Sequence, residues 1–331
     1  MYTTRNHLMT LALCLAVLAL ALFGGPGPAR SADTAVEAVE TAAAVKYRKA
    51  RIQGIDIAYR EAGRAGAPAV VLLHGFPTSS HMFRELMPRL AGDFHMIAPD
   101  YPGYGASDQP KLADFDYSFA NFARVVEALL GQKRIDRYAL YVMDYGAPVG
   151  FRLFARAPER VTGFVIQNGN AYAEGLREFW DPLKAYWGNP SAANGDKLKP
   201  FFELAATRWQ WTHGVPKDKL HLVSPDNWIH DQYLLDRPGN KEIQLRMFLD
   251  YGTNVTEYPK WQALFRRHQP PALIVWGRGD HIFPPAGAHP YARDLKRVET
   301  HLLDTGHFAL ETHLDFIAER MRSFVKRAAG S

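Results

Sequence analysis

An aspartate in a sharp turn is the first candidate for catalysis. Asp144 lies in Tyr141–Gly146, between a β-branched and aromatic run and a helical pattern that begins near Ala147. This strand, turn and helix pattern is typical of a nucleophile elbow, in which Gly146 lets the helix pack closely. A carboxylate in this place would attack carbon and form an ester. The alternative is that Asp144 caps the following helix.

A second aspartate and a histidine follow two later strands. Asp280 lies just past the apolar run that ends at Gly277, and His307 lies just past the run that ends at Leu303. The order nucleophile, acid, histidine is used by one group of hydrolases, in which the acid orients the histidine as a general base. Taken alone, His307 is equally well explained as a helix-capping or core histidine. The ordered set of segments favours the catalytic interpretation.

Two turns are expected to surround these side chains. Leu73-His-Gly-Phe-Pro follows a strand, and its loop can supply a backbone N–H to an oxyanion hole. The expected donors are the backbone N–H groups of Phe76 and Tyr145. The glycine-rich turn at residues 100–107 is expected to shape the wall of the site.

The elements that must position these residues are short apolar runs alternating with helical patterns. This alternation is typical of parallel strands joined by crossover helices. We therefore predict an α/β fold with a mostly parallel sheet flanked by helices, opened by an antiparallel pair near residues 47–61. The predicted parallel strands are Ala69–Leu73, His95–Pro99, Tyr138–Met143, Val161–Gln167, Ala272–Trp276 and Thr300–Leu303, and the clearest helices are Phe119–Gly131 and Leu310–Lys326.

The rhythm changes between about residues 171 and 268, where tryptophans are dense and the periodicity is helical without a strand pattern. This indicates an inserted helical lid. The predicted division is a signal peptide at 1–31, the first part of the core at 32–170, the helical lid at 171–268, and the second part of the core at 269–331.

The first residues have the layout of a secretory signal, with a basic Arg5, an apolar run from Leu8 to Phe23, and small residues and prolines up to Ala32. Cleavage is expected near residues 30–32, giving a secreted or periplasmic protein without stable membrane insertion. The alternative is an uncleaved anchor. Cleavage would remove the only cysteine, Cys14, so no disulfide is expected.

The charge of the chain argues against a polyanionic partner. The net charge of +5 falls to +3 without the signal, which holds two basic and no acidic residues, and the remaining cations are scattered. No nucleic-acid binding is expected, and the oligomeric state is left open.

The combined motifs resemble the α/β-hydrolase superfamily over essentially the whole mature chain, and within it the aspartate-nucleophile branch of epoxide hydrolases and haloalkane dehalogenases. The resemblance implies that Asp144 attacks an sp³ carbon and forms an alkyl-enzyme ester. His307, supported by Asp280, then activates the water that hydrolyses the ester, and Phe76 and Tyr145 N–H groups stabilise the intermediate. It implies no metal and no organic cofactor.

The leaving group separates the two reactions of this branch. Epoxide hydrolases use two lid tyrosines as proton donors, and Tyr251 and Tyr186 are the candidates here. Dehalogenases hold the halide with a Trp directly after the nucleophile and a second Trp or Asn, whereas this chain has Tyr145 and Phe76 in those places. Against this, Val142 stands where epoxide hydrolases usually have glycine.

Epoxide hydrolysis to a vicinal diol is the leading interpretation, and haloalkane dehalogenation is the alternative. A binding protein without turnover is a third class, but it would not need Asp144, Asp280 and His307 together. The aromatic lid predicts a small apolar or amphipathic substrate.

Overall fold

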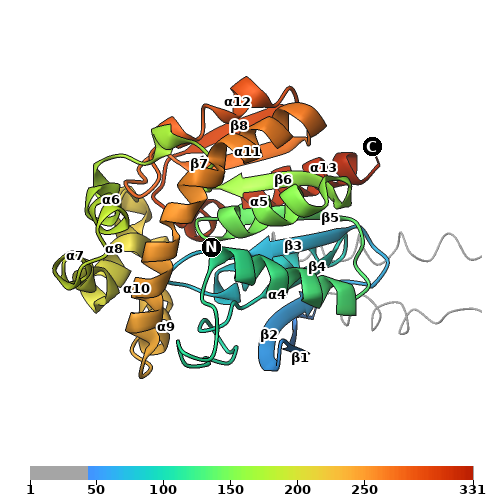
Figure 1. Ribbon diagram of the computed structural model, residues 1–331. Coiled ribbons are helices and arrows are strands. Elements are labelled where there is room, and N and C mark those ends of the chain that lie inside the picture. Colours follow the sequence, from blue (N-terminus) through green and yellow to red (C-terminus); the bar gives the residue numbers. More distant parts are fainter. Residues whose placement is uncertain (1–43, 331) are drawn as a thin grey trace, which may run out of the picture. The chain divides into compact units, whose positions relative to one another are not determined.

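The computed structural model describes residues 44–330, so the predicted signal at residues 1–31 lies outside the described part. Within that part, eight strands form one sheet in the order β1-β2-β4-β3-β5-β6-β7-β8 (Figure 1). β2 pairs antiparallel with β1 and β4, and every pair from β4 to β8 is parallel. The strands are β1 Lys46–Ile52, β2 Ile55–Ala62, β3 Ala69–Leu73, β4 His95–Pro99, β5 Tyr138–Met143, β6 Val161–Gln167, β7 Ala272–Gly277 and β8 Val298–Leu303.

The central strands are buried on both faces. In β5, Leu140 and Val142 belong to one hydrophobic core, and Tyr141 and Met143 belong to the other. Parallel strands covered on both sides are expected as continuous apolar runs. The apolar runs therefore predicted the bounds of β3 to β6 correctly. β7 and β8 extend slightly beyond the predicted bounds.

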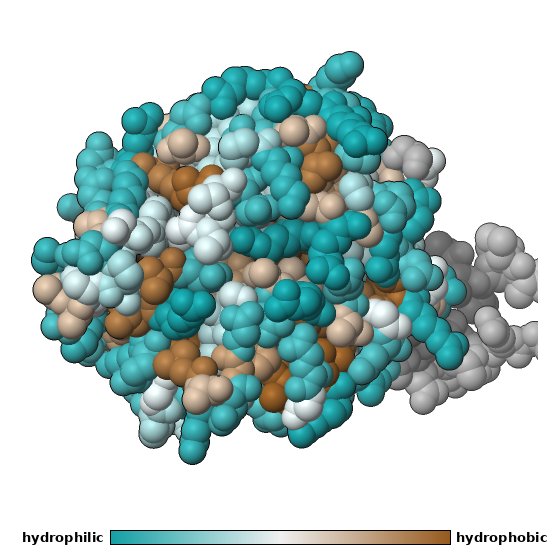
Figure 2. Space-filling view, viewed as in Figure 1, coloured by the Kyte–Doolittle hydropathy of each residue, from teal (hydrophilic) through white to brown (hydrophobic). Residues whose placement is uncertain are grey.

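Helices cover both faces of the sheet. On one face, α4 (Phe119–Gln132) packs against α5 (Gly146–Arg156), and on the other α13 (Leu310–Ala329) packs against α3 (Leu86–Leu90). α4 begins where the Ser118 side chain accepts a hydrogen bond from the Asn121 N–H. The space-filling view in Figure 2 shows a mostly hydrophilic face with small, separate apolar areas.

The chain between β6 and β7 forms helices and no strand. Figure 1 places α6 to α10 beside the carboxyl ends of the parallel strands, where ligands of open α/β sheets bind. The described helices include none that is long and apolar enough to cross a membrane. The elements of this lid are η3 Ala173–Gly175, η4 Glu178–Trp180, α6 Asp181–Gly188, α7 Ala192–Asp196, η5 Lys199–Phe202, α8 Leu204–Thr212, η6 Lys217–Leu222, α9 Pro225–Leu235, α10 Asn240–Asp250 and α11 Gly252–His268.

The other short elements lie in the loops of the core. They are η1 Ser80–Phe83, η2 Pro158–Arg160, η7 Pro285–Gly287 and α12 Tyr291–Asp294.

Candidate active site

Asp144 occupies the tight turn between β5 and α5. Its φ angle is +49°, in the left-handed region that a non-glycine residue adopts at a cost in free energy. The turn leaves no space for a side chain on two neighbouring glycines. A Cβ on Gly146 would lie 2.1 Å from the Leu73 carbonyl oxygen, and one on Gly75 would lie 2.4 Å from the Asp144 Cβ. These glycines therefore allow Asp144 to adopt this strained backbone conformation at the end of β5.

His307 is paired with Asp280, as the chain order predicted. The His307 Nδ1 lies 2.7 Å from the Asp280 Oδ2. The Asp280 Oδ1 accepts a hydrogen bond from the Ile282 backbone N–H at 2.8 Å. Because Asp280 engages Nδ1, the Nε2 atom of His307 is the one available to take a proton.

The free nitrogen of this histidine faces the nucleophile. His307 Nε2 lies 3.9 Å from Asp144 Oδ2 and has no hydrogen-bond partner in the described part of the chain. The other oxygen of Asp144, Oδ1, accepts the Phe76 backbone N–H at 2.7 Å. The separation of 3.9 Å is too long for a hydrogen bond, so His307 is not tied to the nucleophile and can act on another group.

Burial dominates the electrostatics of the pair. It raises the pKa of Asp144 to about 6, although His307 and the backbone N–H groups of Phe76 and Tyr145 favour the ionised form. Burial also opposes the charged form of His307, but Asp280 and Asp144 outweigh it and raise the pKa of His307 above its usual value. Esterification of Asp144 would remove one of these negative charges, which favours a neutral His307 for the second step.

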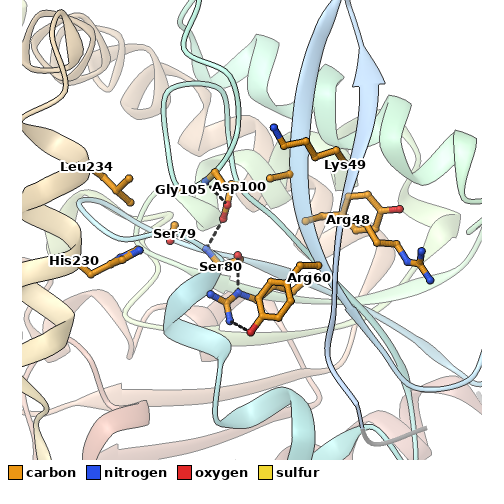
Figure 3. Close-up of a pocket in the computed structure, with 13 residues that line it drawn as sticks. Arg48, Lys49, Arg60, Ser79, Ser80, Asp100, Gly105, His230 and Leu234 are labelled. Atoms are coloured by element: carbon orange, nitrogen blue, oxygen red, sulfur yellow. Dashed lines mark hydrogen bonds between the residues drawn. The ribbon is translucent and has the colours of Figure 1, made fainter. Parts of the chain in front are cut away.

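Hydrogen bonds to Ser80 hold the chain that follows Phe76. The Ser80 backbone N–H donates to Asp100 Oδ1 at 2.8 Å, and its hydroxyl accepts from Arg60 Nε at 3.1 Å. These groups line a cavity of about 420 Å³ that also includes His230 and Leu234 of α9 (Figure 3). Asp144, Asp280 and His307 do not line this cavity, so it is separate from the candidate active site.

Aromatic rings from the lid enclose the other side of the site. The Tyr251 ring contacts both Trp180, at a centroid distance of 4.5 Å, and Trp187, stacked at 5.9 Å. The side chain is 1% exposed, and within residues 44–330 its hydroxyl has the Tyr258 hydroxyl nearby but makes no hydrogen bond of normal length and angle. Burial and nearby groups that include Asp144 raise the pKa of Tyr251 well above its usual value. The phenol is therefore protonated near the nucleophile.

The family follows from a match that covers most of the described chain. The family described as alpha/beta hydrolase fold matches residues 68–314. The chain is an α/β-hydrolase. It is 45% identical over 283 residues to an uncharacterized hydrolase of Saccharomyces cerevisiae, covering 84% of this chain and 96% of the relative. It is also 39% identical over 307 residues to a haloalkane dehalogenase of Mesorhizobium japonicum, covering 86% of this chain and 92% of the relative.

Several solved structures have the same fold as this chain. Haloalkane dehalogenase DbeA from Bradyrhizobium elkani aligns with a TM-score of 0.69 at 23% identity, covering 87% of this chain and 100% of that chain. Cfl2 from Burkholderia cenocepacia aligns with a TM-score of 0.70 at 24% identity, covering 85% and 96%. At these identities the likeness shows the fold alone.

The second tyrosine predicted on the lid of the hydrolase is not brought to the nucleophile. Tyr186 lies on α6, and a Cβ added to Gly195 of α7 would lie 3.5 Å from its ring. Among the hydrogen bonds and ring contacts of residues 44–330, none joins Tyr186 to Asp144 or Tyr251. Tyr186 therefore packs within the lid.

Sequence reasoning missed Asn168, which follows β6 directly. Its side-chain N–H donates to Asp280 Oδ2 at 2.6 Å, and its Oδ1 accepts the Gly277 backbone N–H at 3.0 Å. Its own carbonyl accepts the Asp144 N–H at 3.3 Å. The available signal was a polar residue at the end of a buried parallel strand, beside the strands that carry Asp144 and Asp280.

Within residues 44–330, no group of three or more His, Cys, Asp or Glu side chains is arranged to hold a metal ion.

Proposed function

We propose that this α/β-hydrolase opens epoxides to vicinal diols through an ester formed on Asp144. The observation that carries the proposal is the Tyr251 hydroxyl, which is buried, protonated and under the influence of Asp144, and which makes no hydrogen bond of normal length and angle in the described chain. A buried hydroxyl left unpaired is unfavourable by about 1 to 3 kcal/mol, so an acceptor is expected there during function. An opening epoxide supplies such an acceptor, since its oxygen gains negative charge as the carbon–oxygen bond breaks.

The proposed reaction has two steps. In the first, an oxygen of Asp144 attacks one epoxide carbon, the carbon–oxygen bond breaks, and the released oxygen takes a proton from a tyrosine hydroxyl. In the second, His307 removes a proton from water, which attacks the ester carbonyl, and the second proton of that water ends on the diol. The proton held by His307 then restores the tyrosine through solvent, so the sum is epoxide plus water to diol.

The lid tryptophans favour an epoxide over a halide. A halide clamp needs side-chain N–H donors, as the resemblance to dehalogenases implies. Trp180 Nε1 donates to the Ile282 carbonyl at 2.6 Å, and Trp187 Nε1 donates to the Phe248 carbonyl at 2.7 Å. The two indoles beside Tyr251 are thus already engaged with backbone.

Haloalkane dehalogenation is the second candidate. It is favoured by the Mesorhizobium relative, which is named a haloalkane dehalogenase. In that reaction the tyrosine hydroxyls would donate hydrogen bonds to the halide without giving up a proton.

The lid also indicates the kind of substrate. An apolar hollow of about 450 Å³ lies on it, and the flanking Phe179 ring lies 5.9 Å from Trp180, which in turn contacts Tyr251. This arrangement supports a small apolar or amphipathic substrate. The hollow is lined by Phe179, Pro200, Phe201, Ala205, Ala206, Trp209 and Gln210.

The test is a trapped intermediate. His307→Gln should alkylate Asp144 and stop there, because the general base is needed only for hydrolysis. Intact-protein mass should rise by the full mass of the epoxide, whereas a bromoalkane would add the alkyl group alone. The wild type is the control and should release diol without a lasting adduct. An adduct from bromoalkanes with none from epoxides would reverse the assignment.

A further inference from the structure

Tyr145 carries two separate groups into the site. Its backbone N–H faces the Asp144 carboxylate, as described above. Its side chain is 3% exposed, and its hydroxyl is buried with no hydrogen-bond partner in the described part of the chain. The backbone role therefore leaves the phenol unexplained.

The Tyr145 phenol lies next to the Tyr251 phenol. The ring centroids are 5.9 Å apart, and both rings pack edge-on against Phe119, at 4.8 Å for Tyr145 and 5.5 Å for Tyr251. The two buried hydroxyls, neither of which makes a hydrogen bond of normal length and angle within residues 44–330, thus belong to neighbouring rings, one from the core and one from the lid. Both also lie within the electrostatic influence of Asp144.

A third tyrosine shows that burial alone does not define this pair. Tyr101 is also buried with an unpartnered hydroxyl and is also influenced by Asp144. Its ring, however, packs on His74 at 4.3 Å and stacks on Phe122 at 5.1 Å. No ring contact or hydrogen bond in residues 44–330 joins it to Tyr251.

We infer that the Tyr145 hydroxyl is the second donor to the epoxide oxygen, in the role that sequence analysis assigned to Tyr186. This inference rests on the proposed epoxide hydrolysis. Tyr145 and Tyr251 would hold the oxygen between them while Asp144 attacks the carbon. One of the two phenols gives its proton as the carbon–oxygen bond breaks and becomes a tyrosinate, and the other keeps its proton and donates a hydrogen bond.

The charge balance suits this role. Burial, and to a smaller extent nearby acidic groups that include Asp144, raise the pKa of Tyr145 well above its usual value, so the phenol holds its proton before the reaction. When the ester forms, Asp144 loses its negative charge and no longer raises the pKa of Tyr145. The Tyr145 phenol can then give up its proton more readily. Because Tyr145 directly follows Asp144 in the chain, its distance from the nucleophile does not depend on the lid.

The experiment measures alkylation alone. In the full-length His307→Gln protein, the rate of adduct formation with styrene oxide is followed by rapid quench and intact mass. Adding Tyr145→Phe should slow alkylation about 30-fold to several hundred-fold, as expected for the loss of one donor to a developing oxyanion. Adding Tyr101→Phe, the matched control, should change the rate less than about twofold, since its ring packs on His74 and Phe122 and no ring contact in residues 44–330 joins it to Tyr145 or Tyr251. The transient ultraviolet absorbance of tyrosinate should weaken in the Tyr145→Phe protein.

The outcomes separate the two proposals. An unchanged rate for Tyr145→Phe, with Tyr251→Phe slowed, would overturn the role of Tyr145 and leave epoxide hydrolysis standing. Equal slowing by Tyr101→Phe would also overturn it. If the parent forms no adduct with any epoxide, the proposed function fails, and the inference fails with it. The phenylalanine keeps the ring, so an unchanged thermal midpoint should accompany the slow rate.

Discussion

The core and the lid of this hydrolase contribute to the same site in different ways. On the core side, Asp280 is held through both oxygens, and Asp144 accepts the Phe76 N–H. On the lid side, Tyr251 is held by ring packing, and its hydroxyl makes no hydrogen bond of normal length and angle in the described chain. The core thus fixes charged groups by hydrogen bonds, whereas the lid fixes a phenol by ring packing.

The largest effect should come from the nucleophile. Asp144→Asn should abolish turnover, a loss of about 10⁴-fold or more, because no ester can form. It should also raise the thermal midpoint at pH 8 by about 2 to 4 °C. The folded-state pKa of about 6 is above the unfolded value, so the carboxylate favours folding at low pH and opposes it as pH rises through 6.

The check on this prediction is a pair of melting curves with an activity assay. The gain in stability should shrink as pH falls from 6 to 4, where wild-type Asp144 becomes protonated. Intact mass must show that the amide has not converted to the acid. A midpoint that falls at pH 8 would contradict the electrostatic account of the core.

The lid should give an intermediate effect. Tyr251→Phe should slow single-turnover alkylation by an epoxide about 30-fold to several hundred-fold, equivalent to roughly 2 to 4 kcal/mol in the transition state. Tyr186→Phe is the matched lid variant and should leave the rate unchanged, since its ring packs within the lid. Equal slowing by both variants would show that the donors are a lid pair after all.

The smallest effect should come from Asn168, which supports the acid. Asn168→Ala should slow ester hydrolysis about tenfold through the loss of one charge-assisted hydrogen bond, and alkylation should not change. Without this donor, Asp280 would hold the His307 proton more strongly, so the pKa of His307 should rise. The kcat profile should then shift to higher pH, because only neutral His307 is a base. A uniform loss at every pH would indicate a general structural role instead.

The parts predictable from sequence are those that local chemistry determines. β5 and the turn at Asp144 follow from a continuous apolar run that ends in Asp-Tyr-Gly, and such a signal depends on neighbours only. The pairing of Asp280 with His307 follows from the order of strand ends in a parallel sheet. These predictions needed no knowledge of the lid.

The unpredicted parts depend on which face of an element meets which neighbour. In the sequence, Asn168 has the features of an ordinary turn residue. Its role depends on the pairing of β6 with β7, which brings it to Asp280. Tyr186 and Tyr251 have the same chemistry in sequence, and helical periodicity does not say which one faces Asp144. The contact between the Tyr145 and Tyr251 rings likewise cannot be predicted from the sequence, because it joins the core to the lid.

The hydrogen bonds of Asn168 have a consequence for how the molecule can vary. Asn168 follows β6, the last strand before the lid, and its partners Gly277 and Asp280 lie at the end of β7, the first strand after the lid, so these bonds join the carboxyl ends of the two strands that flank the lid in the chain. The segment of roughly a hundred residues between them therefore forms a loop that these hydrogen bonds close. Because the strands on either side are bonded to each other directly, the lid between them can change without disturbing the core. Lineages could lengthen, shorten or replace it, and with it the range of substrates, while the triad kept its geometry.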